Sequence, residues 1–107
     1  MESVKGIRDI LPDKSAYKRT LYLIKNYKDL KRGEELNEEN RRIPKKIDRA
    51  IELMEDDEYI EIIKMTMEGV RAEEISEKEN IDIRNVYKQR RRLVKRLSVL
   101  LYGDEAL

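Results

Sequence analysis

The segment that most constrains the fold lies near the carboxyl end, where apolar residues follow a helical pattern over about twenty positions. Within residues 83–102 these apolar side chains recur at three- and four-residue spacing, which is the spacing of one helix face. The positions are Val86, Leu93, Leu97, Leu100 and Leu101. We therefore predict a long final helix.

The same segment is strongly basic. Residues 84–96 contain seven Lys or Arg and no acid, whereas residues 52–61 contain six acids and no base. The stretch 14–32 is also basic, although the net charge of the whole chain is only +1. A basic block of this density on a helix is a candidate contact for a polyanion such as DNA.

Composition excludes several function classes. The chain has 107 residues, enough for one small domain, and contains no Cys and no His. Disulfides, Cys- or His-ligated metal sites and a Ser-His-Asp triad are therefore ruled out. Acidic pairs are too common here to indicate catalysis, so we expect no enzyme, no cofactor and no bound metal. No apolar run is long enough to span a membrane, and the first five residues do not resemble a signal peptide. We expect a cytoplasmic protein.

The rest of the sequence predicts an all-α fold of about five helices. A first helix over residues 15–31 begins at the capping residue Ser15, and a polar loop follows over residues 33–42. A second helix starts at Pro44, and a third begins at the acids of residues 56–58 and ends before Gly69. A short helix occupies residues 70–79. We expect residues 1–55 and residues 56–107 to form two regions of one compact unit.

Three residues separate the last two predicted helices. Asn80 tolerates the left-handed conformation that a tight turn requires, and Asp82 is a good N-cap for the final helix. Ile75, Ile81 and Val86 fall where such a turn needs core residues, and Ser76 is small where the helices cross. This spacing predicts a helix-turn-helix.

The second helix of this motif carries side chains suited to DNA. Residues near the start of a recognition helix reach base edges in the major groove, where Arg pairs with guanine and Asn or Gln with adenine. Residues further along are better placed for phosphates. The predicted base readers are Arg84, Asn85, Lys88 and Gln89, and the predicted phosphate contacts are Tyr87, Arg91, Arg92 and Lys95.

These residues resemble a known family. Glu74-Ile75-Ser76, Asn80-Ile81-Asp82, Val86 and Leu93-Val94-Lys95-Arg96-Leu97 look like sigma-70 region 4. Residues 57–103 are most similar to small phage and prophage transcription regulators of the ArpU and RinA type. The resemblance implies binding to double-stranded DNA, control of late phage or prophage genes and contact with RNA polymerase. It makes Asp82 the cap of the recognition helix.

The match has three departures. Arg71 stands where a capping Ser or Thr is usual, and Ser76 replaces the usual Ala. Glu79 stands where a core Leu is usual, and a buried unpaired carboxylate there would be costly.

Other functions remain open at this point. The chain could be a helical bundle with a merely solvated basic helix. It could instead be an adaptor that binds RNA polymerase or another phage protein through the acidic stretch 52–61 or through the N-terminal helices. It could also be a DNA-packaging subunit like the small subunit of terminase. A basic helix lying on a membrane is a further alternative, which we disfavour because residues 86–101 are committed to a core.

The broad apolar face of residues 17–30 predicts a homodimer.

Overall fold

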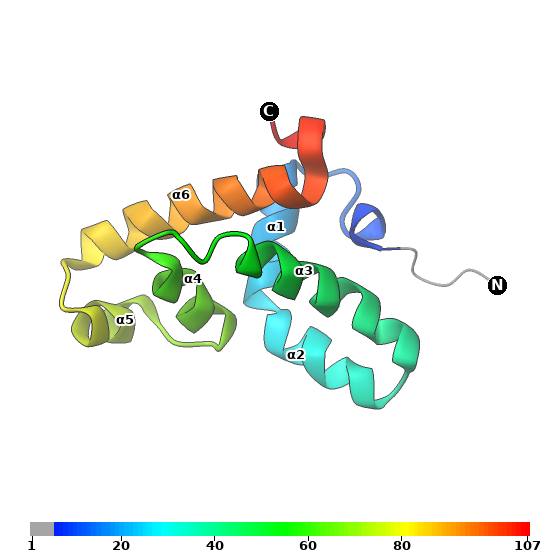
Figure 1. The fold of residues 1–107 in the computed structure, drawn as a ribbon, viewed down its shortest axis with the longest axis horizontal. Coiled ribbons are helices and arrows are strands. Elements are labelled where there is room, and N and C mark those ends of the chain that lie inside the picture. The colour runs from blue at the N-terminus through cyan, green and yellow to red at the C-terminus, as the bar shows by residue number, and fades with distance from the viewer. Residues whose placement is uncertain (1–5) are drawn as a thin grey trace.

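The computed structural model describes residues 6–107, and this part of the chain is all-α, with no strand (Figure 1). Its six α-helices are α1 (Ala16–Lys25), α2 (Tyr27–Arg32), α3 (Arg42–Glu52), α4 (Ile60–Met67), α5 (Ala72–Glu79) and α6 (Ile83–Tyr102). Short 3₁₀ helices lie at Ile7–Asp9, Gly33–Glu35, Glu38–Arg41 and Gly103–Ala106. The predicted fold class is therefore confirmed as all-α.

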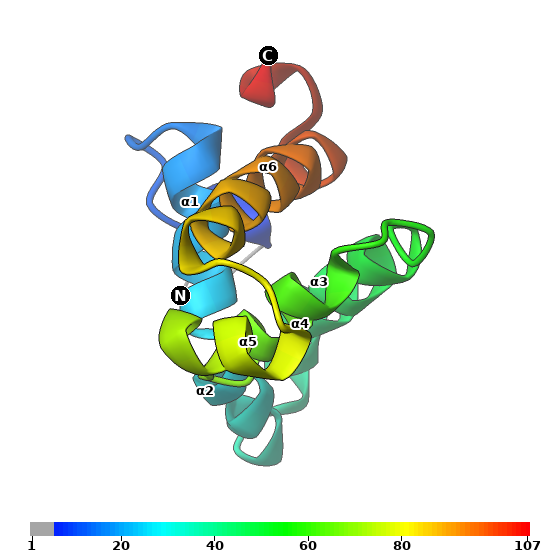
Figure 2. The ribbon, with the colours of Figure 1, turned by 90° about the vertical axis from the view of Figure 1, so that its left-hand side faces the viewer.

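Helix α6 packs against most of the other helices. It contacts α1, α3, α4 and α5, and Figure 2 shows α1 and α3 on opposite sides of it. One face of α6 is fully buried in a core that draws on residues from Ile7 to Tyr102. The expected inward residues Val86, Leu93 and Leu97 are buried, whereas Leu100 is 42% exposed. Residues from both predicted regions, 1–55 and 56–107, contribute to this core.

The predicted first helix is divided at Asn26. Its backbone (φ −107°, ψ 11°) departs from helical values between α1 and α2. The Asn26 side chain donates a hydrogen bond to the Tyr22 carbonyl at 2.8 Å. Asn side chains compete in this way with the helical ladder, which accounts for a helix count one above the expected five.

Other helix boundaries shift by a few residues. Helix α3 begins at Arg42, so Pro44 lies within its first turn rather than at its first position. Helix α4 begins at Ile60, later than the acids of residues 56–58 suggested. The cause is local, because the Asp57 carboxylate accepts a hydrogen bond from the Tyr59 N–H at 3.0 Å and so precedes the helix.

The apolar face of residues 17–30 packs within the chain. Leu23, Ile24 and Tyr27 are buried, and Tyr17, Leu21 and Leu30 are partly buried against the same core. This apolar face was the reason for predicting a homodimer. The structure shows that the face packs against the core of its own chain, so a second copy is not needed to cover it. The homodimer stays a prediction.

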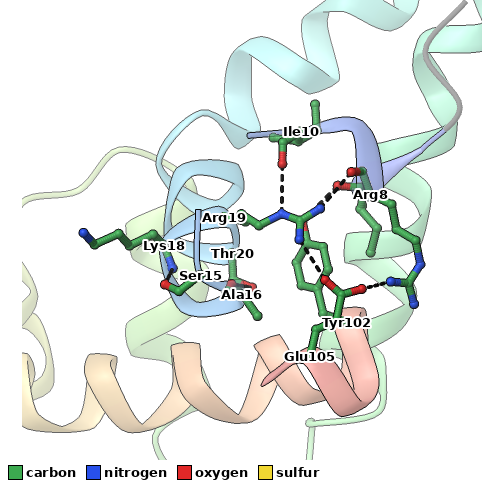
Figure 3. A network of polar contacts seen from close by, with 10 residues as sticks. Arg8, Ile10, Ser15, Ala16, Lys18, Arg19, Thr20, Tyr102 and Glu105 are labelled. Atoms are coloured by element: carbon green, nitrogen blue, oxygen red, sulfur yellow. Dashed lines mark hydrogen bonds and ion pairs between the residues drawn. The ribbon is translucent and has the colours of Figure 1, made fainter. Parts of the chain in front are cut away.

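A buried arginine ties the amino-terminal segment and α1 to the end of α6 (Figure 3). Arg19 is 4% exposed. Its guanidinium donates to the carbonyls of Ile10 at 3.0 Å and Arg8 at 2.8 Å, and to the Glu105 carboxylate at 3.0 Å. It also lies 4.5 Å from the centre of the Tyr102 ring. These contacts satisfy the buried charge and fix α1 beside α6.

Candidate nucleic-acid interface

Helix α5 ends in a hydrogen-bonded turn that sets the direction of α6. Asn80 adopts the left-handed conformation (φ 54°, ψ 49°). The Ile81 N–H donates to the Ser76 carbonyl at 3.1 Å, and the Asn80 N–H donates to the Glu77 carbonyl at 3.3 Å. This bond pair defines a Schellman motif. The Ser76 hydroxyl adds a bond to the Ile81 carbonyl at 2.5 Å, so Ser76 has a specific role here.

The start of α6 is capped as expected. The Asp82 carboxylate accepts a hydrogen bond from the Arg84 N–H at 2.7 Å, which satisfies one of the free donors of the first turn. Ile75 and Val86 are fully buried beneath the turn. Glu79 is exposed, so this departure from the family pattern buries no charge.

The outer face of α6 is a row of four cations, Arg84, Lys88, Arg91 and Lys95, which we call the cationic face. Their spacing of four, three and four residues places them on one side of the helix over about 16 Å. All four are exposed, and the side chain of Arg84 is 90% exposed. The Arg84 Nε atom lies 3.5 Å from the Oδ1 atom of Asp82. The other three form no ion pair with any residue from 6 to 107.

The four predicted base readers fall into two groups. Arg84 and Lys88 lie on the cationic face, whereas Asn85 is half-buried and Gln89 is buried. The Gln89 side-chain amide donates to the side-chain oxygen Oδ1 of Asn85 at 3.2 Å and accepts a hydrogen bond from Arg92 Nε at 2.8 Å. Gln89 therefore has partners within the chain and reaches a base only by exchanging them.

The predicted phosphate contacts divide in a similar way. Arg91 and Lys95 are exposed, and Tyr87 is 42% exposed with the Arg90 guanidinium 5.2 Å from its ring centre. Arg92 instead forms two parallel bonds to Asp57, at 2.8 and 2.9 Å. Arg96 donates to the same carboxylate at 3.1 Å.

The Asp57 side chain is only 6% exposed. Its hydrogen bonds from the Arg92 guanidinium hold the pKa of the Asp57 carboxyl well below its usual range, and the Tyr59 N–H and Arg96 act in the same direction. Burial of the carboxyl opposes them. We call Asp57, Arg92 and Arg96 the Asp57 clamp. Its role could not be read from the sequence, because Asp57 and Arg92 are 35 positions apart.

The acidic stretch 52–61 is largely paired inside the molecule. Glu52 lies 3.0 Å from Arg49, and Asp56 lies 3.6 Å from Arg96. Lys64 lies 2.8 Å from Glu55 and 3.8 Å from Glu61. Much of this negative charge is therefore balanced within residues 49–96.

Two features are absent from the part of the chain that the structure describes. No three acidic side chains there gather into a group that could hold a metal ion. None of the helices there is long and apolar enough to cross a membrane.

Comparisons with known proteins give no match: no protein-family model, curated protein or solved structure matches this chain. The function is therefore inferred from the residues and geometry of the chain itself.

Proposed function

We propose that this protein is a sequence-specific regulator of transcription that binds double-stranded DNA through a helix-turn-helix formed by α5, the turn at residues 80–82 and α6. The observation that carries the proposal is the cationic face. Four exposed cations lie on one helix side, three of them without an ion pair within residues 6–107, and such a concentration of positive charge favours contact with a polyanion such as DNA.

In this proposal the start of α6 enters the major groove. Arg84 is the foremost exposed side chain and pairs with a guanine edge through two hydrogen bonds. Lys88 lies one turn later and also reaches base edges. Arg91 and Lys95 contact phosphates, which fixes the register of the helix without reading sequence.

In this proposal Asn85 and Gln89 still read adenine, but their side chains have to change partners first. Gln89 first exchanges its bonds to Asn85 and Arg92 for bonds to the base. Each exchanged bond changes the free energy by only about 1 kcal/mol net. Adenine readout by Gln89 therefore accompanies a side-chain rearrangement on binding.

The phage or prophage assignment rests on the sequence resemblance to the ArpU and RinA type. An adaptor that docks on RNA polymerase through residues 52–61 is the second candidate. Glu52, Glu55 and Asp56 each lie within 3.6 Å of a cation of the chain, so a partner that binds there has to compete with these internal pairs. A packaging subunit would use the same DNA-binding face.

The test is selection of bound duplexes from a random pool, using the full chain. We expect the wild type to enrich a defined motif. Arg84→Ala should flatten the preference at one position, at a cost of about 1–3 kcal/mol for the lost base contact. Lys46→Ala, on the exposed surface of α3, is the control and should leave the motif unchanged. Failure of the wild type to bind any duplex would refute the proposal.

A further inference from the structure

A notch of about 150 Å³ lies between α1 and α6, beside the cationic face. We call it the α1–α6 notch. Its lining is Tyr17, Leu21, Lys25, Tyr87, Arg90 and Arg91. The volume equals that of about five water molecules in the liquid, which is enough room for a phosphate group.

The lining of the notch is positively charged and includes no acidic residue. Three of its six lining side chains are cations, and none is a carboxylate. Lys25 and Arg91 form no ion pair with any described residue, and Arg90 contacts the ring of Tyr87. Like charges held close together repel, so an anion in the notch relieves that repulsion and accepts charge-assisted hydrogen bonds.

The notch is continuous with the cationic face, because Arg91 belongs to both. Helix α1 lies beside α6 (Figure 2). Lys18 and Lys25 of α1, together with Lys14 just before this helix, line a second, shallow hollow, whose other lining residues are Leu11, Leu21, Tyr22 and Asn26. The positive surface therefore extends from α6 across the notch onto α1.

We propose that the α1–α6 notch binds a backbone phosphate of the same duplex whose major groove receives α6. The inference rests on the proposed DNA-binding function and adds a second contact from α1. A helix in the major groove has phosphate strands on both sides of it, and α1 packs against one flank of α6. Lys25 and Arg90 donate to the phosphate oxygens, and Leu21 and the two tyrosine rings form the wall of the site.

The experiment measures affinity for a random duplex as a function of salt for three variants of the full chain. Lys25→Gln and Arg90→Gln each remove one cation from the notch. Lys46→Gln makes the same chemical change as Lys25→Gln on α3, outside the notch and the cationic face. Thermal melts of all variants show whether each one is folded.

We expect Lys25→Gln to reduce the magnitude of the salt slope by about 0.9, the value for one phosphate contact. Affinity should fall about 3- to 10-fold on every sequence, and the selected motif should not change. Ethylation of one phosphate beside the motif should interfere with binding of the wild type and not of Lys25→Gln. Lys46→Gln should retain the wild-type slope.

The outcomes separate the two proposals. If the wild type binds duplex and Lys25→Gln behaves as Lys46→Gln does, the notch is not a phosphate site, and the proposed function stands. If Lys25→Gln changes the preferred motif, the residue contacts bases, and the notch proposal is wrong. If the wild type binds no duplex, both proposals fall.

Discussion

Replacing Asp57 by Asn should lower stability and raise non-specific DNA affinity at the same time. The substitution keeps a side-chain oxygen for the Tyr59 N–H and removes the negative charge that holds Arg92 and Arg96. The released guanidiniums lie on α6 next to the cationic face. They would then be free to contact phosphate.

The size of the stability loss follows from the burial of the pair. Asp57 is 6% exposed and Arg92 is 46% exposed. Breaking a fully buried ion pair costs about 3–5 kcal/mol, whereas an exposed pair contributes about 0–1 kcal/mol. The half-exposed Arg92 places the expected loss between these limits, at about 2 kcal/mol. For a domain of this size, that loss lowers Tm by about 10 °C.

The assay compares urea unfolding of wild type, Asp57→Asn and Asp56→Asn. Asp56 is the matched control, because its side chain is 81% exposed and its ion-pair contact is Arg96 at 3.6 Å. We expect Asp56→Asn to change stability by less than about 0.5 kcal/mol. Equal stability of the two variants would show that the Asp57 clamp contributes nothing, and the reasoning would be wrong.

The stability difference between wild type and Asp57→Asn should depend on pH. The folded-state pKa of Asp57 is depressed, so the ion pair stabilises the fold above the unfolded-state pKa of about 4. This contribution is lost as the pH falls through and below that value. The stability difference between wild type and Asp57→Asn should therefore shrink below about pH 4. A difference that stays constant down to pH 2 would contradict the assignment.

The remaining predictions concern the turn, its cap and the oligomeric state. Asn80→Ala should destabilise the chain by about 1 kcal/mol, and Asn80→Gly should not, because Gly has no Cβ to clash at φ 54° whereas Ala does; urea unfolding measures both. Asp82→Ala should cost about 1 kcal/mol through loss of the cap, and equal stability of wild type and variant would refute that role. The homodimer is tested by sedimentation, and a monomer at high micromolar concentration would contradict it.

Local signals in the sequence predicted the carboxyl-terminal half well. The start of α6 at Ile83 and its end at Tyr102 agree with the structure. Asn80 adopts the left-handed conformation and Asp82 caps the helix, as expected. The turn and the cap depend on residues within five positions of one another, and the extent of α6 follows from the repeat of its apolar residues, so both can be read from a sequence.

Long-range pairing could not be predicted in this way. Arg92 was expected to be free for phosphate, and its bond to Asp57 depends on how α6 packs against the segment before α4. Gln89 was expected to point outward, but it is buried. The helical repeat alone does not show whether position 89 faces solvent or a neighbouring segment, because that depends on what packs against α6. The break at Asn26 is a local competition between side chain and backbone that the apolar pattern does not register.

The central claim is that the exposed cations of α6 contact duplex DNA. The most direct measurement compares duplex affinity of two double variants that change net charge equally. Lys88→Glu with Lys95→Glu reverses charge on the cationic face, and Lys45→Glu with Lys46→Glu does so on the exposed surface of α3. We predict that the first variant loses duplex binding at physiological salt and the second retains most of it. Equal losses in the two variants would show that net charge, rather than this face, accounts for binding.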